Sequence, residues 1–159
     1  MDYYKIEKNL EKEIQEKFNY PNRKIGVIVH IEDKDGKTLL QQRGKKSRDE
    51  NGLYEDVGGK VEEEDFNYKK AMIREMREEM GEEARIQLSD AIGVYHCNKN
   101  DVNWVFVIFF GLYIEGKIKI MEPDKCIGYH FFEYEELMNS KLVTESCKHL
   151  TKSLKNHHT

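Results

Sequence analysis

The sequence predicts an α/β protein in which helices pack on a mixed β-sheet. Three observations support this fold class: residues 3–18 place apolar side chains at helical spacing, residues 24–116 contain several apolar runs of strand length, and residues 68–80 and 144–155 are again helical in pattern. A hairpin followed by a helix, more strands and a last helix is typical of a sheet covered by helices. The 159 residues have the size of one domain, so we expect a single domain over residues 1–159.

The first segment predicts an amphipathic helix that precedes the sheet. Its apolar side chains recur at helical spacing and are Tyr3, Ile6, Leu10, Ile14 and Phe18. The sequence NYPN follows, and its proline and asparagines end a helix. We therefore predict an N-terminal helical extension over residues 1–20, which could cover the sheet or join a homodimer.

The next two apolar runs predict a β-hairpin. They lie in KIGVIVHIEDKDGKTLLQQR, residues 24–43, on either side of Asp35-Gly36, a dipeptide suited to the positive φ angles of a tight turn. A short strand is expected next in LYEDVGGKVE. The pair Gly58-Gly59 is expected to interrupt it, where the backbone turns or approaches a ligand.

Three later segments predict further strands, and they are residues 84–97, 103–116 and 129–137. The middle segment, NWVFVIFFGLYIEG, is apolar enough to be central in the sheet. Residues 144–155 predict a last polar helix.

Charge, hydropathy and cysteine content exclude several classes of protein. The formal net charge of -4 argues against a general affinity for nucleic acid. The apolar run at residues 105–114 has about half the length that a membrane helix needs, and the N-terminus has no signal-peptide core, so no membrane contact is expected. The cysteines at 97, 126 and 147 are odd in number and far apart, as expected of free thiols in a reducing compartment. We expect a cytoplasmic protein.

Residues 68–80 predict a helix with one apolar and one acidic face. Asn67 is suited to begin it and Gly81 to end it. The apolar face consists of Met72, Ile73, Met76 and Met80, and the acidic face consists of Glu75, Glu78, Glu79 and Glu82. Acidic faces are commonly solvated, because glutamate is a good helix former.

This acidic face is unfavourable in two ways when nothing is bound to it. Carboxylates three and four residues apart repel each other, and the last turn of a helix favours positive charge because of the helix dipole. A divalent cation removes both problems, since hard carboxylate oxygens suit Mg²⁺, and water and phosphate oxygens complete its shell. Arg74 lies beside the acidic face, where its guanidinium can hold one carboxylate, and Arg77 points elsewhere.

The stretch GGKVEEEDFNYKKAMIREMREEMG resembles the signature of the Nudix hydrolases. That signature has a glycine, a later acidic residue, then Arg-Glu, an apolar residue, any residue, Glu-Glu and a closing glycine. The resemblance implies a Nudix-type α/β/α sandwich over residues 24–137, in addition to the N-terminal helix. It also implies that bound divalent metal supports cleavage of a nucleoside diphosphate linked to another group.

By the same resemblance, the metal ligands are Glu75, Glu78, Glu79 and the backbone carbonyl of Gly59. Arg74 orients one of the glutamates, and Arg74 with the three glutamates forms the catalytic set. The general base stays open between Glu79 and an acidic residue of a later loop.

The loop before the acidic helix departs from the signature by one residue. Counting from Gly59 places the expected glutamate position at Asp65, whereas counting from Gly58 places it at Glu64. One inserted residue explains either alignment, so both stay open. Outside this count, Glu82 stands where the family usually has an apolar residue, and proline is absent before the glycines.

The candidate base-binding residues lie outside the signature. The stretch MEPDKC, residues 121–126, resembles MutT-like members that act on nucleoside triphosphates, which implies that Glu122 and Asp124 lie near the base. Trp104 and Phe106 could stack on that base, although aromatic residues in such a strand more often fill a core.

The candidate phosphate-binding residues are basic. Arg43 at the end of a predicted strand is expected to contact the terminal phosphates, and Lys60 beside the glycine pair is expected to contact the substrate as well. Lys45 and Lys46 are more typical of a solvated loop.

These expectations define a Mg²⁺-dependent pyrophosphohydrolase that converts a nucleoside triphosphate to the monophosphate and pyrophosphate, with Mn²⁺ as a second usable ion. Within the same family, the alternative substrates are dinucleoside polyphosphates, nucleotide sugars and capped RNA ends. Nucleic acid is expected to bind only as such a capped end. Outside enzymes, the alternative is a non-catalytic module that senses a nucleotide.

Overall fold

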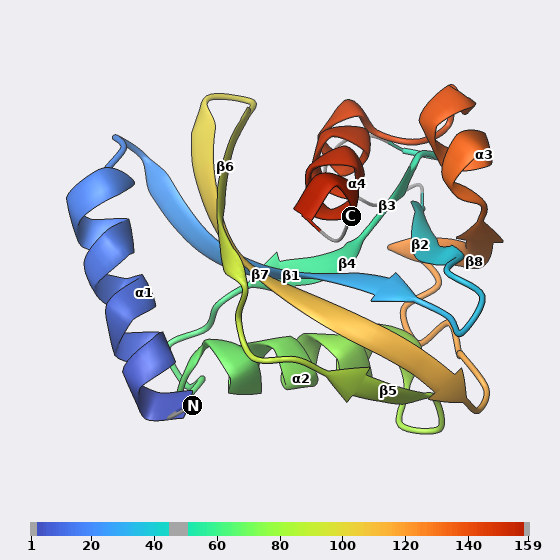
Figure 1. Ribbon diagram of the computed structural model, residues 1–159, viewed down its shortest axis with the longest axis horizontal. Helices are drawn as coiled ribbons and strands as arrows, with labels where there is room; N and C mark the ends of the chain where they lie inside the picture. The colour runs from blue at the N-terminus through green and yellow to red at the C-terminus, as the bar shows by residue number, and fades with distance from the viewer. Residues whose placement is uncertain (1–2, 45–50, 158–159) are drawn as a thin grey trace.

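A mixed β-sheet lies between helices in the computed structural model, which describes residues 3–44 and 51–157 (Figure 1). The elements are α1 (Tyr3–Lys17), β1 (Arg23–Glu32), β2 (Thr38–Arg43), β3 (Tyr54–Glu55), β4 (Val57–Lys60), α2 (Tyr68–Met80), β5 (Arg85–Leu88), β6 (Gly93–Lys99), β7 (Val102–Glu115), β8 (Cys126–Phe132), α3 (Tyr134–Asn139) and α4 (Glu145–His157). The predicted fold class is confirmed.

Strands β1 and β7 form the centre of the sheet. They run parallel over ten residue pairs, from Arg23 opposite Asn103 to Glu32 opposite Leu112. Beyond β7, the strands β6 and β5 pair antiparallel with its first and second halves. Beyond β1 lie β4 and β2, and β2 also pairs with β3 and β8. The prediction that the apolar segment of β7 is central is therefore confirmed.

Helices cover both faces of this sheet, as Figure 1 shows with α2 on one side and with α3 and α4 on the other. Under α2, the buried side chains include Met72, Met80, Val27, Val107 and Phe109. A second cluster joins the sheet to α3 and α4, and it consists of Leu40, Phe132, Leu137, Val143 and Cys147. Burial of these apolar side chains fixes α2 against the sheet, with its opposite face free for binding.

The predicted N-terminal helix is confirmed as α1. It is attached to the sheet by Arg23, whose Nη1 donates to the carbonyl oxygens of Ile14 and Phe18 at 3.3 and 3.1 Å. A second attachment reaches the first turn of α2, where the backbone N–H of Lys69 donates to Glu7 Oε1 at 3.1 Å.

None of the helices in residues 3–44 and 51–157 has the length and apolar character that a membrane span requires.

The predicted hairpin between β1 and β2 is confirmed, but its tight turn at Asp35-Gly36 is not. Gly36 has φ of 81°, whereas Asp35 is not among the described residues with positive φ. The connection is longer because Asp33 Oδ1 accepts from the backbone N–H groups of Asp35 and Lys37 at 2.9 and 2.8 Å. The side chain of Asp33 thus takes the place of a two-residue turn.

The glycine pair lies inside β4 and does not interrupt it. Gly58 and Gly59 face Ile28 and Val27 in the antiparallel register with β1. A Cβ at Gly58 would lie 2.5 Å from the carbonyl oxygen of Val27, so glycine permits close approach of two strands here. The strand is interrupted before the glycine pair, between β3 and β4.

Two predicted strands have different bounds in the structure. Residues 84–97 form β5 and β6 with a break between them, because the two strands pair with different halves of β7. Residues 129–137 are strand only up to Phe132 and then become α3. Glu133 and Glu136 form a capping box at this point, and the backbone N–H of Glu133 donates to Glu136 Oε1 at 3.2 Å, which starts the helix.

Candidate functional site

A cleft of about 820 Å³ runs from α2 and β4 past β2 to β6 and α4. In Figure 1, β6 and α4 rise from the same side of the sheet, with β1 and β7 beneath them. Eight of the site residues expected from the sequence line this cleft: Arg43, Gly59, Lys60, Arg74, Glu75, Glu78, Glu79 and Glu122. Asp124, by contrast, is exposed on the loop before β8 and does not line it.

The bounds of α2 follow from its caps, as the sequence predicts. The side chain of Asn67 accepts from the backbone N–H of Lys70 at 2.8 Å, which begins the helix. The backbone N–H of Gly81 donates to the carbonyl of Arg77, and the φ of 83° at Gly81 ends it. Met72 and Met80 are fully buried below. The glutamates between these caps therefore point to the cleft.

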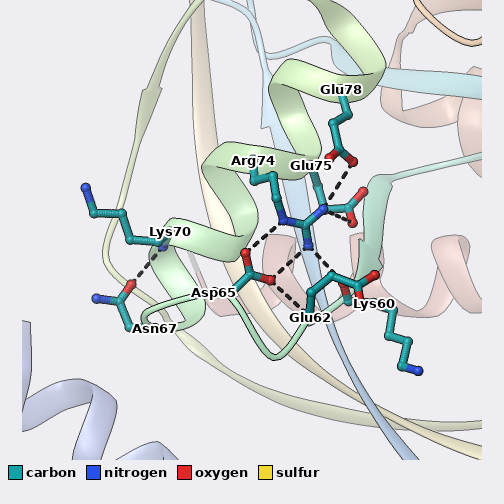
Figure 2. A network of polar contacts seen from close by, with 8 residues as sticks. All are labelled: Lys60, Glu62, Asp65, Asn67, Lys70, Arg74, Glu75 and Glu78. Carbon is teal, nitrogen blue, oxygen red and sulfur yellow. Dashed lines mark hydrogen bonds and ion pairs between the residues drawn. The ribbon is translucent and has the colours of Figure 1, made fainter.

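Arg74 is the centre of a network that joins α2 to the preceding loop (Figure 2). Its Nε and Nη2 donate to the two carboxylate oxygens of Asp65 at 2.8 and 2.9 Å. Its Nη1 donates to Glu75 Oε1 at 3.0 Å and to Glu78 Oε2 at 3.1 Å. Its Nη2 also donates to the carbonyl of Lys60 at 3.1 Å. One guanidinium thus orients two glutamates and the loop.

The irregular loop places Asp65, rather than Glu64, on Arg74. The hydrogen bonds from Arg74 lower the pKa of Asp65, and Asp65 in turn raises the pKa of Arg74. Asp65 Oδ2 also accepts from the backbone N–H of Glu62 at 2.8 Å, which closes the loop. Glu64 is exposed and lines the cleft.

The carboxylate of Glu75 lies directly against Gly59. A Cβ on Gly59 would stand 2.3 to 2.5 Å from the carboxyl atoms of Glu75, so only glycine allows this arrangement. Burial raises the pKa of Glu75, although the charge of Arg74 opposes that rise. This contact holds strand β4 and helix α2 close together.

The Oε2 atom of Glu79 is buried beside the cleft, and no ion pair to Glu79 is found among the described residues. Burial raises its pKa well above the usual range, and the charge of Glu75 raises it further, while a hydrogen bond from Gln41 opposes the rise. Within the part of the chain that the structure describes, Glu79 Oε2 has no hydrogen-bond partner. The hydroxyl of Tyr129 donates to the backbone carbonyl of Glu79 at 2.9 Å, which fixes the backbone here.

These residues fit a divalent cation that is bound together with water and substrate oxygens. In residues 3–44 and 51–157, no three His, Cys, Asp or Glu side chains already converge on one point. However, Glu79 Oε2 is unpartnered, and the charges of Glu75 and Glu122 both act on Glu79. Carboxylate oxygens that lack a partner are the donors that Mg²⁺ and Mn²⁺ bind.

Part of the cleft wall is aromatic. Trp104 and Phe106 are stacked, with ring centroids 5.3 Å apart and an angle of 8° between planes, and both line the cleft. Each is half-buried, so neither belongs to the closed core. Arg43 also lines the cleft, where it is ion-paired with Glu55, and Lys99 Nζ lies 3.7 Å from the same carboxylate.

Sequence reasoning missed two polar features, Gln41 on Glu79 and a buried pair formed by His30 and Asp56. His30 Nδ1 lies 3.2 Å from Asp56 Oδ1, and the two side chains are 2% and 0% exposed. Burial disfavours the charged imidazole, but hydrogen bonds with Asp56 and Glu32 outweigh it and raise the pKa of His30 to about 9. No local motif marks these contacts, because each joins residues that are far apart in the sequence.

Comparison with known proteins identifies the family of this chain. The NUDIX domain matches residues 22–153. The chain belongs to the Nudix family. Helix α1 precedes the matched residues. Nudix hydrolases generally need divalent metal ions. The family predicted from the α2 signature is therefore confirmed.

A curated relative of this Nudix chain is the CTP pyrophosphohydrolase of Escherichia coli (strain K12). The two are 48% identical over 62 residues, a segment that covers 39% of this chain and 44% of that enzyme. The match thus spans less than half of the relative's length.

Solved structures share the fold, and two of those described next are named as MutT proteins. The MutT protein from Methanosarcina mazei Go1 has a TM-score of 0.76 at 21% identity, covering 86% of this chain and 96% of that one. The MutT NUDIX hydrolase from Burkholderia pseudomallei has a TM-score of 0.67 at 25% identity, with 82% and 96% covered. The NUDIX domain of Shewanella oneidensis NrtR, complexed with ADP ribose, has a TM-score of 0.70 at 15% identity, with 94% and 98% covered.

Proposed function

We propose that this Nudix hydrolase is a Mg²⁺-dependent pyrophosphohydrolase that converts a nucleoside triphosphate to the monophosphate and pyrophosphate. The observation that carries this proposal is the cleft itself. The cleft holds the carboxylates of Glu75 and Glu79 without enough positive charge, and the stacked rings of Trp104 and Phe106 line the same cleft. Such a cleft complements a metal-bound phosphate chain joined to a planar base.

The residues that would hold Mg²⁺ are Glu75, Glu78, Glu79 and the carbonyl of Gly59. Bound there, the ion would neutralise phosphate charge and favour attack by water on the anhydride. Arg74 keeps Glu75 and Glu78 oriented through its hydrogen bonds. Mn²⁺ has the same preference for oxygen ligands and is expected to replace Mg²⁺.

The proton of the attacking water must pass to a carboxylate in the cleft. Glu79 offers an unpartnered oxygen, and Glu122 comes from a later loop, where Lys125 Nζ lies 3.3 Å from its carboxylate. Both carboxylates line the cleft, and each is a candidate for this role.

Substrate contacts are assigned along the length of the cleft. Lys60 and Arg43 would contact phosphates, and Glu122 would lie toward the nucleoside. Stacking on an aromatic ring tolerates any base, so a preference must come from polar groups nearby. The Escherichia coli relative is named for CTP, which makes CTP the first substrate to test. Asp124 is assigned a smaller part in base binding, since it does not line the cleft.

A second candidate is binding or cleavage of a nucleoside diphosphate linked to a sugar. The NrtR NUDIX domain, which shares this fold, was crystallised with ADP ribose. If this chain resembles it in function, ADP-ribose should bind without release of pyrophosphate from any triphosphate.

A nucleotide screen tests the proposal. Purified protein is incubated with each ribo- and deoxyribonucleoside triphosphate, ADP-ribose and a capped RNA in the presence of Mg²⁺, and products are identified by ³¹P NMR. We expect a monophosphate and pyrophosphate from at least one triphosphate. Release of orthophosphate instead, or turnover of ADP-ribose alone, would contradict the proposal.

A matched pair of variants tests whether that activity depends on the cleft. Glu78→Gln is expected to lower turnover by about 10²-fold or more, because it removes a metal ligand. Glu82→Gln is the control, since Glu82 follows the same helix but is 81% exposed and lies 4.0 Å from Arg77. Full turnover in Glu78→Gln would show that the metal site lies elsewhere.

A further inference from the structure

The hairpin formed by β6 and β7 has one face in the cleft and one face turned away from it. The strands pair antiparallel, with Cys97 opposite Trp104 and Asn98 opposite Asn103, and directly opposite side chains share a face. The hairpin residues that line the cleft are Tyr95, Cys97, Lys99, Trp104 and Phe106. The alternate residues, which include Asn98 and Asn103, therefore lie behind the aromatic wall of the cleft.

The closed end of this hairpin has little support from the rest of the sheet. Asn100 and Asp101 form its turn, with φ of 51° and 65°. The ladder between β7 and β1 begins at Asn103, and in the part of the chain that the structure describes Val102 pairs with β6 alone. A two-stranded ribbon by itself is marginally stable in water. Other contacts must therefore fix the end of the wall that carries Trp104.

Asn103 is the centre of the contacts behind the wall. Its Nδ2 donates to the carbonyl of Pro21 at 2.7 Å, and its backbone N–H donates to the carbonyl of Asn22 at 3.2 Å. Its Oδ1 accepts from Asn98 Nδ2 at 3.1 Å and lies 2.8 Å from His96 Nε2. Because an amide oxygen only accepts, this ring nitrogen is the donor. One asparagine thus joins both strands of the hairpin to the linker between α1 and β1.

That linker, residues 18–22, contacts the hairpin at two more points. The ring of Tyr20 is stacked on the ring of His96, with centroids 3.8 Å apart and an angle of 8° between planes. Asn22 Nδ2 donates to the carbonyl of Asp101 at 2.9 Å, in the turn itself. The linker therefore supports the face of the hairpin that points away from the cleft, from His96 to the turn.

The place of Asn103 in the chain connects these contacts to the cleft. Asn103 and Trp104 are neighbours in β7, so the planar peptide unit between them transmits a displacement of one to the other. Trp104 is in turn stacked on Phe106, with ring centroids 5.3 Å apart. Loss of the contacts behind Asn103 should therefore move the wall that faces the cleft, although Asn103 itself does not line it.

We propose that Asn103 is a positioning residue for the aromatic wall that binds the base. With Tyr20 and Asn22 behind it, Asn103 fixes the ring of Trp104 where a base can stack, and it does so without contact with the substrate. Nucleotide affinity then depends on Asn103, whereas cation affinity, which belongs to α2 and β4, does not. The proposal rests on the proposed function, since it requires a nucleotide at Trp104.

Fluorescence of the free protein tests the first step of this proposal. Trp104 is the only tryptophan in the sequence, so its emission reports on this wall alone. Asn103→Leu keeps the size of the side chain and removes its hydrogen bonds. We expect Trp104 to become more accessible to quenching by acrylamide. Asn139→Leu, the same substitution at an exposed position of α3, is the control. Equal quenching in Asn103→Leu and wild type would overturn the proposal.

Nucleotide binding tests the second step. The α,β-methylene analogue of CTP, or of another triphosphate that the screen identifies, resists cleavage between its α and β phosphates and can be titrated in Mg²⁺ by calorimetry. We expect Asn103→Leu to bind it about 10-fold more weakly, as for partial loss of base stacking. Its Mn²⁺ affinity should equal that of the wild type. In turnover of the triphosphate, KM should rise and kcat should stay unchanged.

A second variant removes a different contact of the linker with the hairpin. Asn22→Gly deletes the hydrogen bond to the turn, and glycine keeps the φ of 52° at this position without strain. We expect a smaller loss of nucleotide affinity in the same direction. Asn19→Gly, at an exposed position of the same linker, is the control and should bind as the wild type does.

The outcomes separate this role from the proposed function. If the wild type binds the analogue, and both Asn103→Leu and Asn22→Gly bind it equally well, the role of Asn103 is wrong and the proposed function stands. If the variants lose Mn²⁺ affinity as well, Asn103 supports the whole fold and the proposal is wrong. If the wild type binds no nucleotide, the proposed function fails and this role fails with it.

Discussion

Asp56 and Glu79 are two carboxylates that line the cleft and have very different charged neighbours. Asp56 is fully buried and lies 3.2 Å from His30, whose pKa is raised to about 9 and which is therefore positively charged. Glu79 is buried beside the neutral Gln41, and the nearby charges of Glu75 and Glu122 are negative. Each has one buried oxygen without a hydrogen-bond partner among the described residues, but only Asp56 has a positively charged neighbour in contact with it.

This difference indicates which acid serves the fold and which serves binding. A buried charge with a partner is costly to disrupt, because loss of one member leaves the other uncompensated. A buried charge without a partner lowers the stability of the free protein and is retained where a ligand completes it. Substitutions at Asp56 and Glu79 should therefore have opposite effects on stability and activity.

The largest expected effect is the loss of activity in Glu79→Gln. Removal of a carboxylate that holds Mg²⁺ should lower kcat by about 10³-fold, or about 4 kcal/mol. Steady-state kinetics on the substrate found in the screen measure this loss, and Glu82→Gln should keep wild-type kinetics. A loss of less than 10-fold would show that Glu79 is outside the reacting centre.

Asp56→Asn should show the reverse pattern. It removes the charge that stabilises protonated His30, and we expect the free energy of unfolding to fall by about 2–3 kcal/mol. Urea denaturation measures the change. Mn²⁺ affinity of the folded variant should stay within 2-fold of wild type, and a large drop in that affinity would place Asp56 in the metal site.

Gly59→Ala tests the close contact of β4 with the acidic helix. The new Cβ would meet the Glu75 carboxyl atoms at 2.3 to 2.5 Å, so that carboxylate must move. We expect a loss of kcat of about 10²-fold, because a small displacement of a catalytic group is enough for this effect. Gly93→Ala is the control, since a Cβ there would meet nothing within 4 Å.

The smallest expected effect is the dependence of stability on pH that His30 causes. Its pKa is raised in the folded protein from 6.5 to about 9. The contribution of His30 is therefore complete below pH 6.5 and is lost as the pH rises toward 9, by on the order of 1–3 kcal/mol. The difference in unfolding free energy between wild type and His30→Gln should shrink over this range.

A control histidine sharpens that measurement. His130 is 48% exposed and lies 3.2 Å from Glu136 at the surface. His130→Gln is therefore the matched substitution of an exposed histidine, to be measured over the same pH range. An unchanged difference between wild type and His30→Gln from pH 6.5 to 9 would mean that the buried imidazole is neutral.

The features that the sequence predicted are those coded by neighbouring residues. Asn67 and Gly81 bound α2 through local hydrogen bonds, and the spacing of the methionines determines which face is buried. The Nudix signature likewise lies in one continuous stretch, so the family could be predicted from it. Arg74 was correctly expected to contact a glutamate of its own helix.

The features that the sequence did not predict depend on contacts between residues of different elements and loops. His30 and Asp56 are 26 residues apart, and Gln41 reaches Glu79 from another element. The choice of Asp65 over Glu64 depends on how the loop closes onto Arg74, which spacing alone left open. The start of α3 was missed because aromatic residues before it continue the strand pattern up to Phe132.

The central claim is that Glu79 lowers the stability of the free protein and that a divalent cation compensates it. Chemical denaturation of wild type and Glu79→Gln at pH 8, in EDTA and again in Mg²⁺, tests this most directly. We predict that Glu79→Gln is at least as stable as wild type in EDTA, and that Mg²⁺ stabilises the wild type much more than the variant. A variant that is less stable in EDTA, yet gains as much from Mg²⁺ as the wild type, would contradict the account.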